Sequence, residues 1–171
     1  QDHKRVGVGD TGPNTGGMGA YSPAPVVDEV IYQRVMDEVI YPTVKGMAEE
    51  GNSYTGFLYA GLMIMADGTP KVIEYNCRFG DPETQPILMR LKSDLLSLLL
   101  AATDDQAGAL KDFPIQWDTR TALGVVMASA NYPDTPKLGD EITGLPSDLN
   151  DAHVFHAGTA LQGEQVVTSG G

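Results

Sequence analysis

Two polar side chains, two positions apart in a predicted strand, could together hold a divalent metal ion. Residues 71–76 are rich in β-branched and aromatic side chains, and the cluster before them, which contains glycine and proline, is typical of a turn. Because side chains alternate along a strand, Glu74 and Asn76 are expected to lie on the same face. A carboxylate and an amide oxygen are hard ligands that suit magnesium. The pair therefore predicts a metal site on this strand.

One cation and two further carboxylates follow the predicted strand. Arg78 continues the same face if the strand extends so far, and Gly80 and Pro82 then end it. Asp81 and Glu83 are therefore expected on a loop at the strand end. Taken singly, each of these residues is more simply explained by a solvated side chain or an Arg–Asp ion pair. Taken together, they suit a phosphorylated substrate that is handled with a divalent metal.

The composition limits the classes of partner. With 11 basic and 23 acidic residues, the chain of 171 residues carries a formal net charge of −12, which argues against nucleic acid or an anionic membrane as the main partner. Cys77 is the only cysteine, and we expect a buried thiol in a reducing, cytoplasmic compartment. No apolar run reaches the roughly 20 residues that span a bilayer, and no signal peptide is recognised. The scattered histidines predict no zinc site, because His153 and His156 would lie on opposite faces of a strand.

Periodicity and turn residues predict an alternation of helices and strands. A long helix is expected at residues 25–50, with a kink or a split near Tyr41 because Pro42 lies inside it. An antiparallel pair of strands follows, at residues 55–65 and 71–76, joined at Asp67 and Gly68. Two helices are predicted next, at residues 84–91 and 95–102, and the second is expected to be buried and capped by Ser93-Asp94. A short helical piece is expected at residues 106–111. The last predicted elements are a buried strand at 122–128 and two strands, at 154–159 and 165–168, around a turn at 162–164.

Two long motifs occur in the order of one known enzyme family. Residues 78–85 read RFGDPETQ and are preceded by EYN at residues 74–76, while residues 12–23 read GPNTGGMGAYSP. These motifs resemble the phosphoribosylamine–glycine ligase family, also called glycinamide ribonucleotide synthetases, which are ATP-grasp enzymes of purine synthesis. The resemblance extends less tightly over nearly the whole chain, and the motif at 78–85 favours this family over other ATP-grasp carboxylate–amine ligases.

The resemblance implies a fold and a reaction. The fold is α+β: residues 1–115 are expected to form the later part of an ATP-grasp domain, and residues 116–171 the start of a β-rich C-terminal domain. The reaction is the ATP-dependent ligation of glycine to 5-phosphoribosylamine through a glycyl phosphate, giving glycinamide ribonucleotide, ADP and phosphate. Both ends look cut, so the adenine-binding part is expected to lie outside the chain, and the segment alone is expected to be inactive. The alternatives are another ATP-grasp carboxylate–amine ligase and a non-catalytic fragment that binds anions.

The resemblance also assigns roles to individual residues. It implies catalytic roles for Arg78 and Asp81 and a magnesium or manganese site at Glu74 and Asn76. Substrate binding is implied for Asp10, Asn14, Gly17, Met18, Tyr21 and Glu83, and binding of the ATP cofactor for Lys4. The sequence departs from the family pattern at Val8, where relatives usually carry an acidic residue, and at residues 58–65, which contain no acidic metal ligand.

The resemblance also affects how the first 25 residues are interpreted. Their glycine and proline content is typical of a disordered linker. The segment nevertheless holds the only dense cationic cluster of the chain, at residues 2–5, and glycines let backbone amides approach an anion. Mainly because of the family resemblance, we expect residues 10–21 to form an ordered loop over the ribose phosphate.

Overall fold

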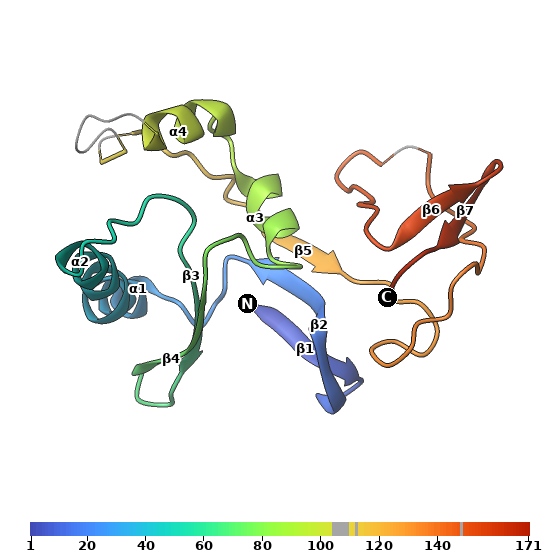
Figure 1. Ribbon diagram of the computed structural model, residues 1–171, viewed down its shortest axis with the longest axis horizontal. Helices are drawn as coiled ribbons and strands as arrows, with labels where there is room; N and C mark the ends of the chain where they lie inside the picture. Colours follow the sequence, from blue (N-terminus) through green and yellow to red (C-terminus); the bar gives the residue numbers. More distant parts are fainter. Residues whose placement is uncertain (104–109, 112, 148) are drawn as a thin grey trace. The chain divides into compact units, whose positions relative to one another are not determined.

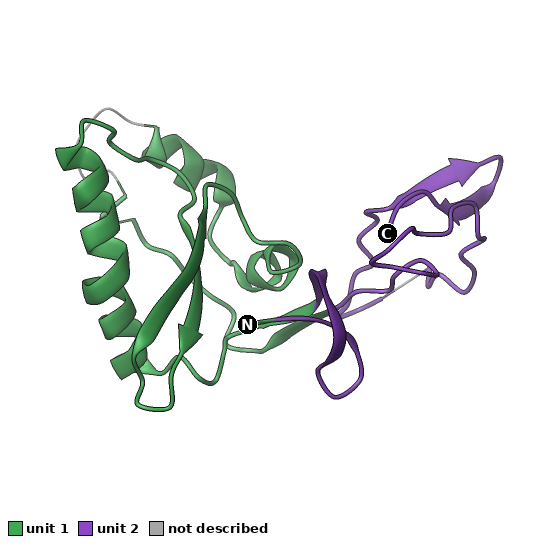
Figure 2. Ribbon diagram, turned by 60° about the horizontal axis from the view of Figure 1, so that its bottom comes forward, with its two compact units in different colours: residues 1–2, 19–124 green, residues 3–18, 125–171 purple. Residues whose placement is uncertain are grey.

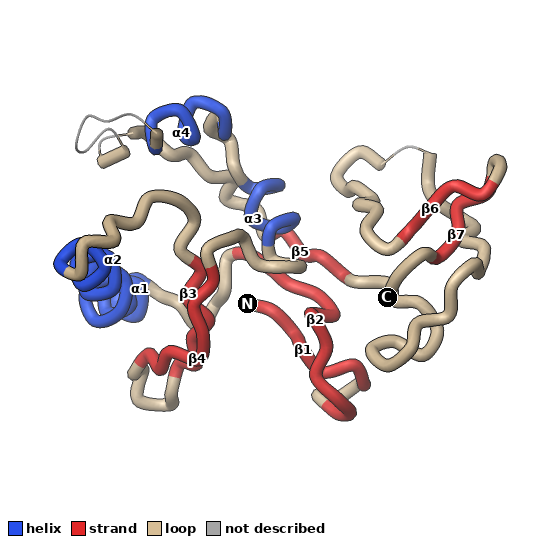
Figure 3. Tube along the Cα trace, in the orientation of Figure 1, coloured by secondary structure: helices blue, strands red, loops and turns tan. Residues whose placement is uncertain are grey.

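The computed structural model describes residues 1–103, 110–111, 113–147 and 149–171 and has an α+β fold of helices and small antiparallel sheets (Figures 1 and 3). The chain divides into two compact units (Figure 2). Unit 1 contains residues 1–2 and 19–124, and unit 2 contains residues 3–18 and 125–171. The predicted fold class is confirmed, whereas the predicted domain boundary near residue 115 stays a prediction.

A continuous helical stretch in unit 1 begins at α1 (Glu29–Val35) rather than at residue 25. Asp28 is the N-cap, and its carboxylate accepts a hydrogen bond from the backbone N–H of Ile31 at 2.8 Å. Such a cap satisfies an N–H group that has no partner inside the helix. The predicted start at residue 25 was therefore four residues too early, because the N-cap Asp28, and not Pro25, determines where the helix begins.

Pro42 changes the hydrogen bonding of this helix. The stretch continues as a π-helical turn, η1 (Met36–Ile40), and then as α2 (Tyr41–Glu49), with Pro42 in the first turn of α2. Proline lacks an N–H group, and its ring clashes with the carbonyl four residues back in a regular α-helix. The backbone N–H of Tyr41 donates to the carbonyl of Met36, five residues back, so a wider turn accommodates the proline. The expected disturbance near Tyr41 is thus a π turn within one helical stretch.

The hairpin of β3 (Tyr59–Ile64) and β4 (Pro70–Asn76) carries the predicted metal ligands. The strands pair antiparallel, with Tyr59 opposite Asn76 and Gly61 opposite Glu74. The predicted turn is confirmed: Gly68 has φ 79°, and the Asp67 carboxylate accepts from the N–H of Thr69 at 2.9 Å. The register shifts between Gly61 and Leu62, which leaves Ile73 without a partner as a β-bulge. The first strand begins at Tyr59, four residues later than expected.

Two short helices follow the hairpin, α3 (Thr84–Arg90) and α4 (Leu95–Ala102), and their predicted bounds hold within one residue. Asp94 caps α4 by accepting from the N–H of Ser97 at 2.8 Å. The expectation that α4 is buried was wrong, since Leu96 is 63% and Leu100 is 62% exposed. Leucine lies on every side of this helix, and the described part of the chain covers none of its residues fully.

Arg90 connects three segments of unit 1. Its Nε donates to the carbonyl oxygens of Asp118 at 3.2 Å and Arg120 at 3.1 Å, and its Nη1 donates to Ser22 Oγ at 2.8 Å. The guanidinium also lies 5.9 Å from the centre of the Trp117 ring. One half-buried side chain thus joins the end of α3 to β2 (Thr11–Ser22) and to residues 117–120.

Asp118 receives two cations at the same segment. Arg120 Nη2 lies 2.9 Å and Lys92 Nζ lies 3.1 Å from its Oδ2 atom. Hydrogen bonds from Arg120, and then the bond from Lys92, hold the pKa of the Asp118 carboxyl well below its usual range. Residues 117–120 are therefore held through two backbone carbonyls by Arg90 and through the Asp118 side chain by Lys92.

The first residues of the chain form paired strands and not the expected loop. The strands β1 (Asp2–Gly7), β2 and β5 (Ala122–Val125) are hydrogen-bonded neighbours in that order. The turn between β1 and β2 contains Gly9 at φ 74° and Asp10 at φ 59°. The hydroxyl of Thr15 donates to the Lys4 carbonyl at 2.8 Å. The segment is ordered as expected, but cross-strand pairing makes it a hairpin.

The C-terminal part of the chain differs from the prediction in two places. The strand β5 ends at Val125, and Leu123 at 69% and Met127 at 92% exposure contradict the expected buried strand. The final hairpin is confirmed at its turn, but its strands are β6 (Thr159–Gln162) and β7 (Gln165–Thr168), so residues 154–158 lie outside it. Residues 139–142 pair with β7 instead and help to bury Val167. The helical piece predicted at 106–111 falls largely outside the described residues.

Replacing Arg90 by alanine is expected to lower the free energy of unfolding of unit 1 by about 2 kcal/mol, because charged donors to three oxygens are lost. Urea denaturation measures the change. Arg34→Ala is the matched control, since Arg34 makes an exposed pair with Glu38 one helical turn away, and such pairs contribute little. Equal stability of the two variants would contradict the connecting role of Arg90.

Candidate functional site

The two predicted metal ligands lie on one face of β4. Glu74 is opposite Gly61 and Asn76 is opposite Tyr59, with regular alternation between them, and the bulge lies on the turn side of Glu74. Glu74 is exposed and Asn76 is half-buried. The arrangement offers one carboxylate and one amide oxygen, which fits magnesium or manganese with several positions left for substrate oxygens and water.

In the described part of the chain, the pair is not part of a larger cluster of acidic, histidine or cysteine side chains. Within residues 1–103, 110–111, 113–147 and 149–171, no group of three or more His, Cys, Asp or Glu side chains could hold a metal ion. A magnesium ion commonly keeps several waters and binds one or two protein oxygens together with substrate phosphates. The donor set therefore suits a metal that arrives with a phosphorylated substrate.

Residues after Asn76 depart from the predicted alternation. The strand ends at Asn76, and Cys77 and Arg78 form a bend, so Arg78 does not extend the face of Glu74 as a strand residue. Its Nη1 donates to the carbonyl of Phe79 at 2.7 Å, and the side chain is exposed. Cys77 is exposed as well, which contradicts the expected buried thiol. The bend explains both differences, because side chains no longer alternate across a pleat.

The two carboxylates of the following turn have different surroundings. Asp81 is exposed, whereas Glu83 is half-buried at the start of α3. The Tyr59 hydroxyl donates to Glu83 Oε1 at 2.9 Å. The other oxygen, Glu83 Oε2, is shielded from solvent and has no hydrogen-bond partner in the described part of the chain. The Glu83 carboxylate is therefore fixed through Oε1, while Oε2 lies against Gly80.

Sequence reasoning missed Tyr59. Burial, then the hydrogen bond to Glu83, and then the negative charges of Glu83, Asp2 and Glu74 raise the pKa of this hydroxyl well above its usual range. Carboxylates from three separate segments thus act on this hydroxyl, and Glu83 is the one that accepts its hydrogen bond. The sequence offers a partial signal. Pairing residues outward from the turn at Gly68 places Tyr59 opposite Asn76 only if the extra, unpaired residue of the bulge is taken into account.

The remaining predicted site residues lie on the β1–β2 hairpin. Unit 2 contains Lys4, Asp10, Asn14, Gly17 and Met18, while Tyr21 belongs to unit 1. Asp10 is exposed in the hairpin turn and Asn14 is exposed on β2, whereas Gly17 is buried.

Two of these residues have backbone roles in unit 2. The carbonyl of Met18 accepts from the N–H of Val126 at 3.0 Å, and the carbonyl of Lys4 accepts from Thr15. In unit 1 the Tyr21 hydroxyl donates to Gln1 Oε1 at 2.6 Å. The Tyr59 hydroxyl thus links Glu83 to the hairpin that carries Glu74 and Asn76, and the role of the β1–β2 residues stays a prediction.

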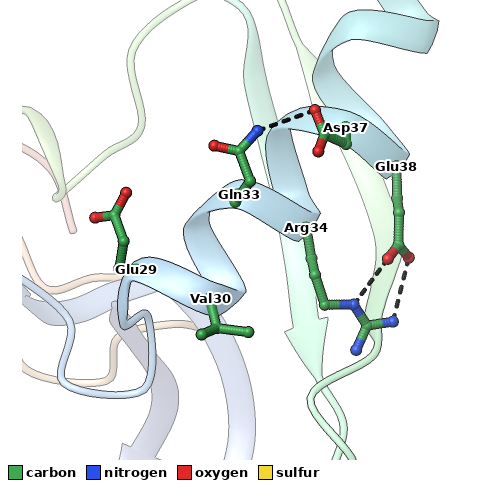
Figure 4. A pocket seen from close by; sticks show the side chains of 6 residues that line it. All are labelled: Glu29, Val30, Gln33, Arg34, Asp37 and Glu38. Atoms are coloured by element: carbon green, nitrogen blue, oxygen red, sulfur yellow. Dashed lines mark hydrogen bonds and ion pairs between the residues drawn. The ribbon is translucent and has the colours of Figure 1, made fainter.

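A shallow hollow on α1 and η1 contains no predicted site residue (Figure 4). Two side-chain pairs line it: Gln33 Nε2 donates to Asp37 Oδ1 at 3.0 Å, and Arg34 Nε donates to Glu38 Oε1 at 2.7 Å. Within each pair the two residues are one helical turn apart, so their side chains meet on the helix surface and satisfy each other's hydrogen-bonding groups. The hollow therefore carries no candidate chemistry.

In the described part of the chain, helices are too short or too polar to cross a membrane.

Comparison with protein families identifies the class of enzyme. Residues 1–84 match the ATP-grasp (A) domain of phosphoribosylglycinamide synthetase, and residues 122–171 match the C domain of the same family. The two matches cover more than three quarters of the chain. The hairpin with Glu74 and Asn76 therefore belongs to an ATP-grasp domain. The chain belongs to the phosphoribosylglycinamide synthetase family, and not to another family of ATP-grasp ligases.

Individual relatives agree with this assignment. The chain is 65% identical to a phosphoribosylamine–glycine ligase of Yersinia pestis over 173 aligned residues and 61% identical to one of Ralstonia nicotianae over 171. Each comparison covers 100% of this chain and 40% of the relative. A crystal structure of phosphoribosylamine–glycine ligase from Thermotoga maritima superposes with a TM-score of 0.79 at 37% identity, over 100% of this chain and 41% of that one. The chain thus spans about 40% of the length of the relatives it matches.

Proposed function

We propose that this chain contributes to the ATP-dependent ligation of glycine to 5-phosphoribosylamine, which yields glycinamide ribonucleotide, ADP and phosphate. The observation that carries the proposal is the joint presence of the family match and of Glu74 and Asn76 on one face of β4. The relatives at 61–65% identity are named for this reaction. The small-molecule partners proposed are glycine, 5-phosphoribosylamine and ATP.

The chemistry sets what the residues must do. The glycine carboxylate attacks the γ-phosphate of ATP, which forms glycyl phosphate and releases ADP, and the amine of 5-phosphoribosylamine then displaces phosphate. Glu74 and Asn76 would hold magnesium or manganese, which neutralises phosphate oxygens when bound. Arg78 would stabilise the charge that spreads over the transferring phosphoryl group, since its exposed fork can contact two oxygens.

The other predicted residues supply binding contacts in this proposal. Asp81 and Glu83 would bind the amino group of a substrate, and Lys4 would contact ATP. The β1–β2 hairpin would contact the ribose phosphate through Asp10, Asn14, Gly17 and Met18, with Tyr21 at the end of β2. A cytoplasmic location is consistent with the exposed, unbridged thiol of Cys77.

The reaction is tested in a chimera, in which these 171 residues replace the matching segment of the Yersinia pestis relative. We expect ADP release that requires both glycine and 5-phosphoribosylamine, with the unmodified relative as the positive control. A folded chimera that releases no ADP supports the alternative of a non-catalytic anion-binding segment. ADP release that does not depend on glycine would overturn the proposed substrate.

In the active chimera, Arg78→Lys is expected to lower kcat by about 10²-fold with little change in the KM for ATP. The reason is that an ammonium makes a point contact where the planar guanidinium can hold two oxygens as charge develops. Steady-state kinetics measures the change, with Arg34→Lys on the surface of α1 as the matched control. An unchanged kcat would instead leave Arg78 with a local contact only, its bond to the Phe79 carbonyl.

Metal binding can be measured on the chain itself. Glu74→Gln and Asn76→Ala are each expected to weaken Mn²⁺ binding about tenfold or more, because each removes one of two protein oxygens from the proposed site. Electron paramagnetic resonance of free Mn²⁺ gives the affinity. Glu49→Gln is the matched control, since Glu49 lies at the end of α2 in an exposed pair with Lys45. If the unmodified chain and all three variants bind Mn²⁺ with equal affinity, Glu74 and Asn76 are not ligands of the metal site.

A further inference from the structure

We propose that Tyr132 is a further binding residue, whose hydroxyl donates a hydrogen bond to the phosphate of 5-phosphoribosylamine beside Gly16. The inference rests on the proposed function and deepens it, because it adds a residue of the segment that matches the C domain to the contacts of the β1–β2 hairpin. Gly16 and Tyr132 both belong to unit 2 (Figure 2).

Two backbone amides of the glycine-rich strand β2 are used within the protein. The N–H of Gly17 donates to Thr15 Oγ1 at 3.0 Å, and the Thr15 hydroxyl donates in turn to the Lys4 carbonyl. The N–H of Gly16 donates to the Tyr132 hydroxyl oxygen at 3.0 Å. An anion beside Gly16 therefore needs a side-chain donor in place of these two amides.

The Tyr132 hydroxyl can supply this donor. A phenolic hydroxyl has one hydrogen to donate and can accept a hydrogen bond at the same time. Its oxygen accepts from Gly16, and in the described part of the chain no residue accepts its hydrogen. Accepting one hydrogen bond also polarises the hydroxyl and strengthens the bond that it donates. The hydroxyl can therefore pass the polarity of the Gly16 amide on to a ligand.

The space beside Gly16 is open to a ligand. A Cβ atom on Gly16 would lie 3.3 Å from the Tyr132 hydroxyl oxygen, and no other described atom outside the adjoining residues would lie within 4 Å of it. Gly16 is exposed and Tyr132 is half-buried. A ligand can thus reach the hydroxyl along the side of Gly16 that carries no side chain.

The Tyr132 ring is held by the C-terminal part of unit 2. The N–H of Tyr132 donates to the Ser129 carbonyl at 3.2 Å, which closes a turn. A Cβ atom on Gly171 would lie 2.7 Å from Tyr132 Cε2 and 3.3 Å from Pro136 Cγ, so the ring packs directly against the backbone of Gly171. A ring fixed in this way places its hydroxyl before the ligand arrives, which lowers the entropy cost of binding.

A cation along the same hairpin favours an anionic ligand. Arg5 of β1 is exposed, and its Nη1 donates to the carbonyl of Gly12 in β2 at 2.6 Å. A guanidinium has five N–H donors, so this bond leaves others for a ligand. The chain as a whole carries a formal net charge of −12, which makes a local cation necessary for binding an anion. A cation together with a neutral hydroxyl donor suits a phosphate group.

The test is Tyr132→Phe in the active chimera described above, since phenylalanine keeps the ring and removes only the hydroxyl. We expect the KM for 5-phosphoribosylamine to rise about tenfold, as loss of a hydrogen bond to a charged group predicts, with the KM values for glycine and ATP unchanged. Ribose 5-phosphate should become a weaker competitive inhibitor by a similar factor, whereas inhibition by ribose, which lacks the phosphate, should not change. A rise confined to ATP or glycine, a uniform effect on all three substrates, or no effect overturns the inference.

Gly16→Ala is a second test that keeps the tyrosine. The added Cβ atom crowds the hydroxyl and fills the open side of the strand. The KM for 5-phosphoribosylamine should again rise selectively. Because both substitutions act on one contact, the double variant should show less than the product of the two single effects. A full product would show that Gly16 and Tyr132 act separately and would contradict the shared contact.

Matched controls come from unit 1. Tyr75→Phe also removes a bonded hydroxyl, which lies 2.8 Å from Thr43 Oγ1. Gly46→Ala adds a methyl group on α2, where no described atom outside the helix backbone lies within 4 Å. Both variants should leave every KM unchanged.

Failure of the inference and failure of the proposed function give different results. An unmodified chimera without glycine-dependent ADP release removes the proposed function. An active chimera in which Tyr132→Phe leaves the KM for 5-phosphoribosylamine unchanged removes only the role of Tyr132. If Tyr132→Phe does not fold, Gly16→Ala decides, and an unchanged KM for 5-phosphoribosylamine in that variant overturns the inference.

Discussion

The pairing register of β3 with β4 is the constraint on which the candidate site depends. It sets Tyr59 opposite Asn76 and Gly61 opposite Glu74. A shift by one residue would move both predicted metal ligands, Glu74 and Asn76, to the other face of the hairpin, because the side-chain period of a strand is two. The same register brings the Tyr59 hydroxyl to Glu83 at the start of α3. One ladder of backbone hydrogen bonds thus positions groups from three segments.

The remainder of unit 1 holds this hairpin in place. The helical stretch lies against β4 through α1 and η1, and Thr43 of α2 bonds to Tyr75. Val39 of η1 is among the few strongly buried apolar residues described. Elsewhere in the unit, Arg90 joins α3 to residues that lie far away in the sequence. Polar side chains with several partners therefore supplement a small apolar core.

Local chemistry allowed much of this structure to be predicted from the sequence. The Asp67–Gly68 turn and the Asp94 cap are short-range signals, and both were found where expected. The same reasoning failed for the burial of α4 and β5, because the apolar content of a segment does not say what covers it. Tyr59 was missed for a related reason: its partners come from β3, β4 and α3, and their meeting depends on contacts that are distant in sequence.

The unpaired residue Ile73 has a consequence for how this hairpin can vary. The residues on either side of it keep their partners, with Glu74 opposite Gly61 and Val72 opposite Leu62. Removal of Ile73 would therefore restore a regular ladder without changing any of these pairs. The bulge separates the turn half of the hairpin from the half that bears Glu74 and Asn76. Loss of one residue at this point would thus shorten the strand while Glu74 and Asn76 keep their partners.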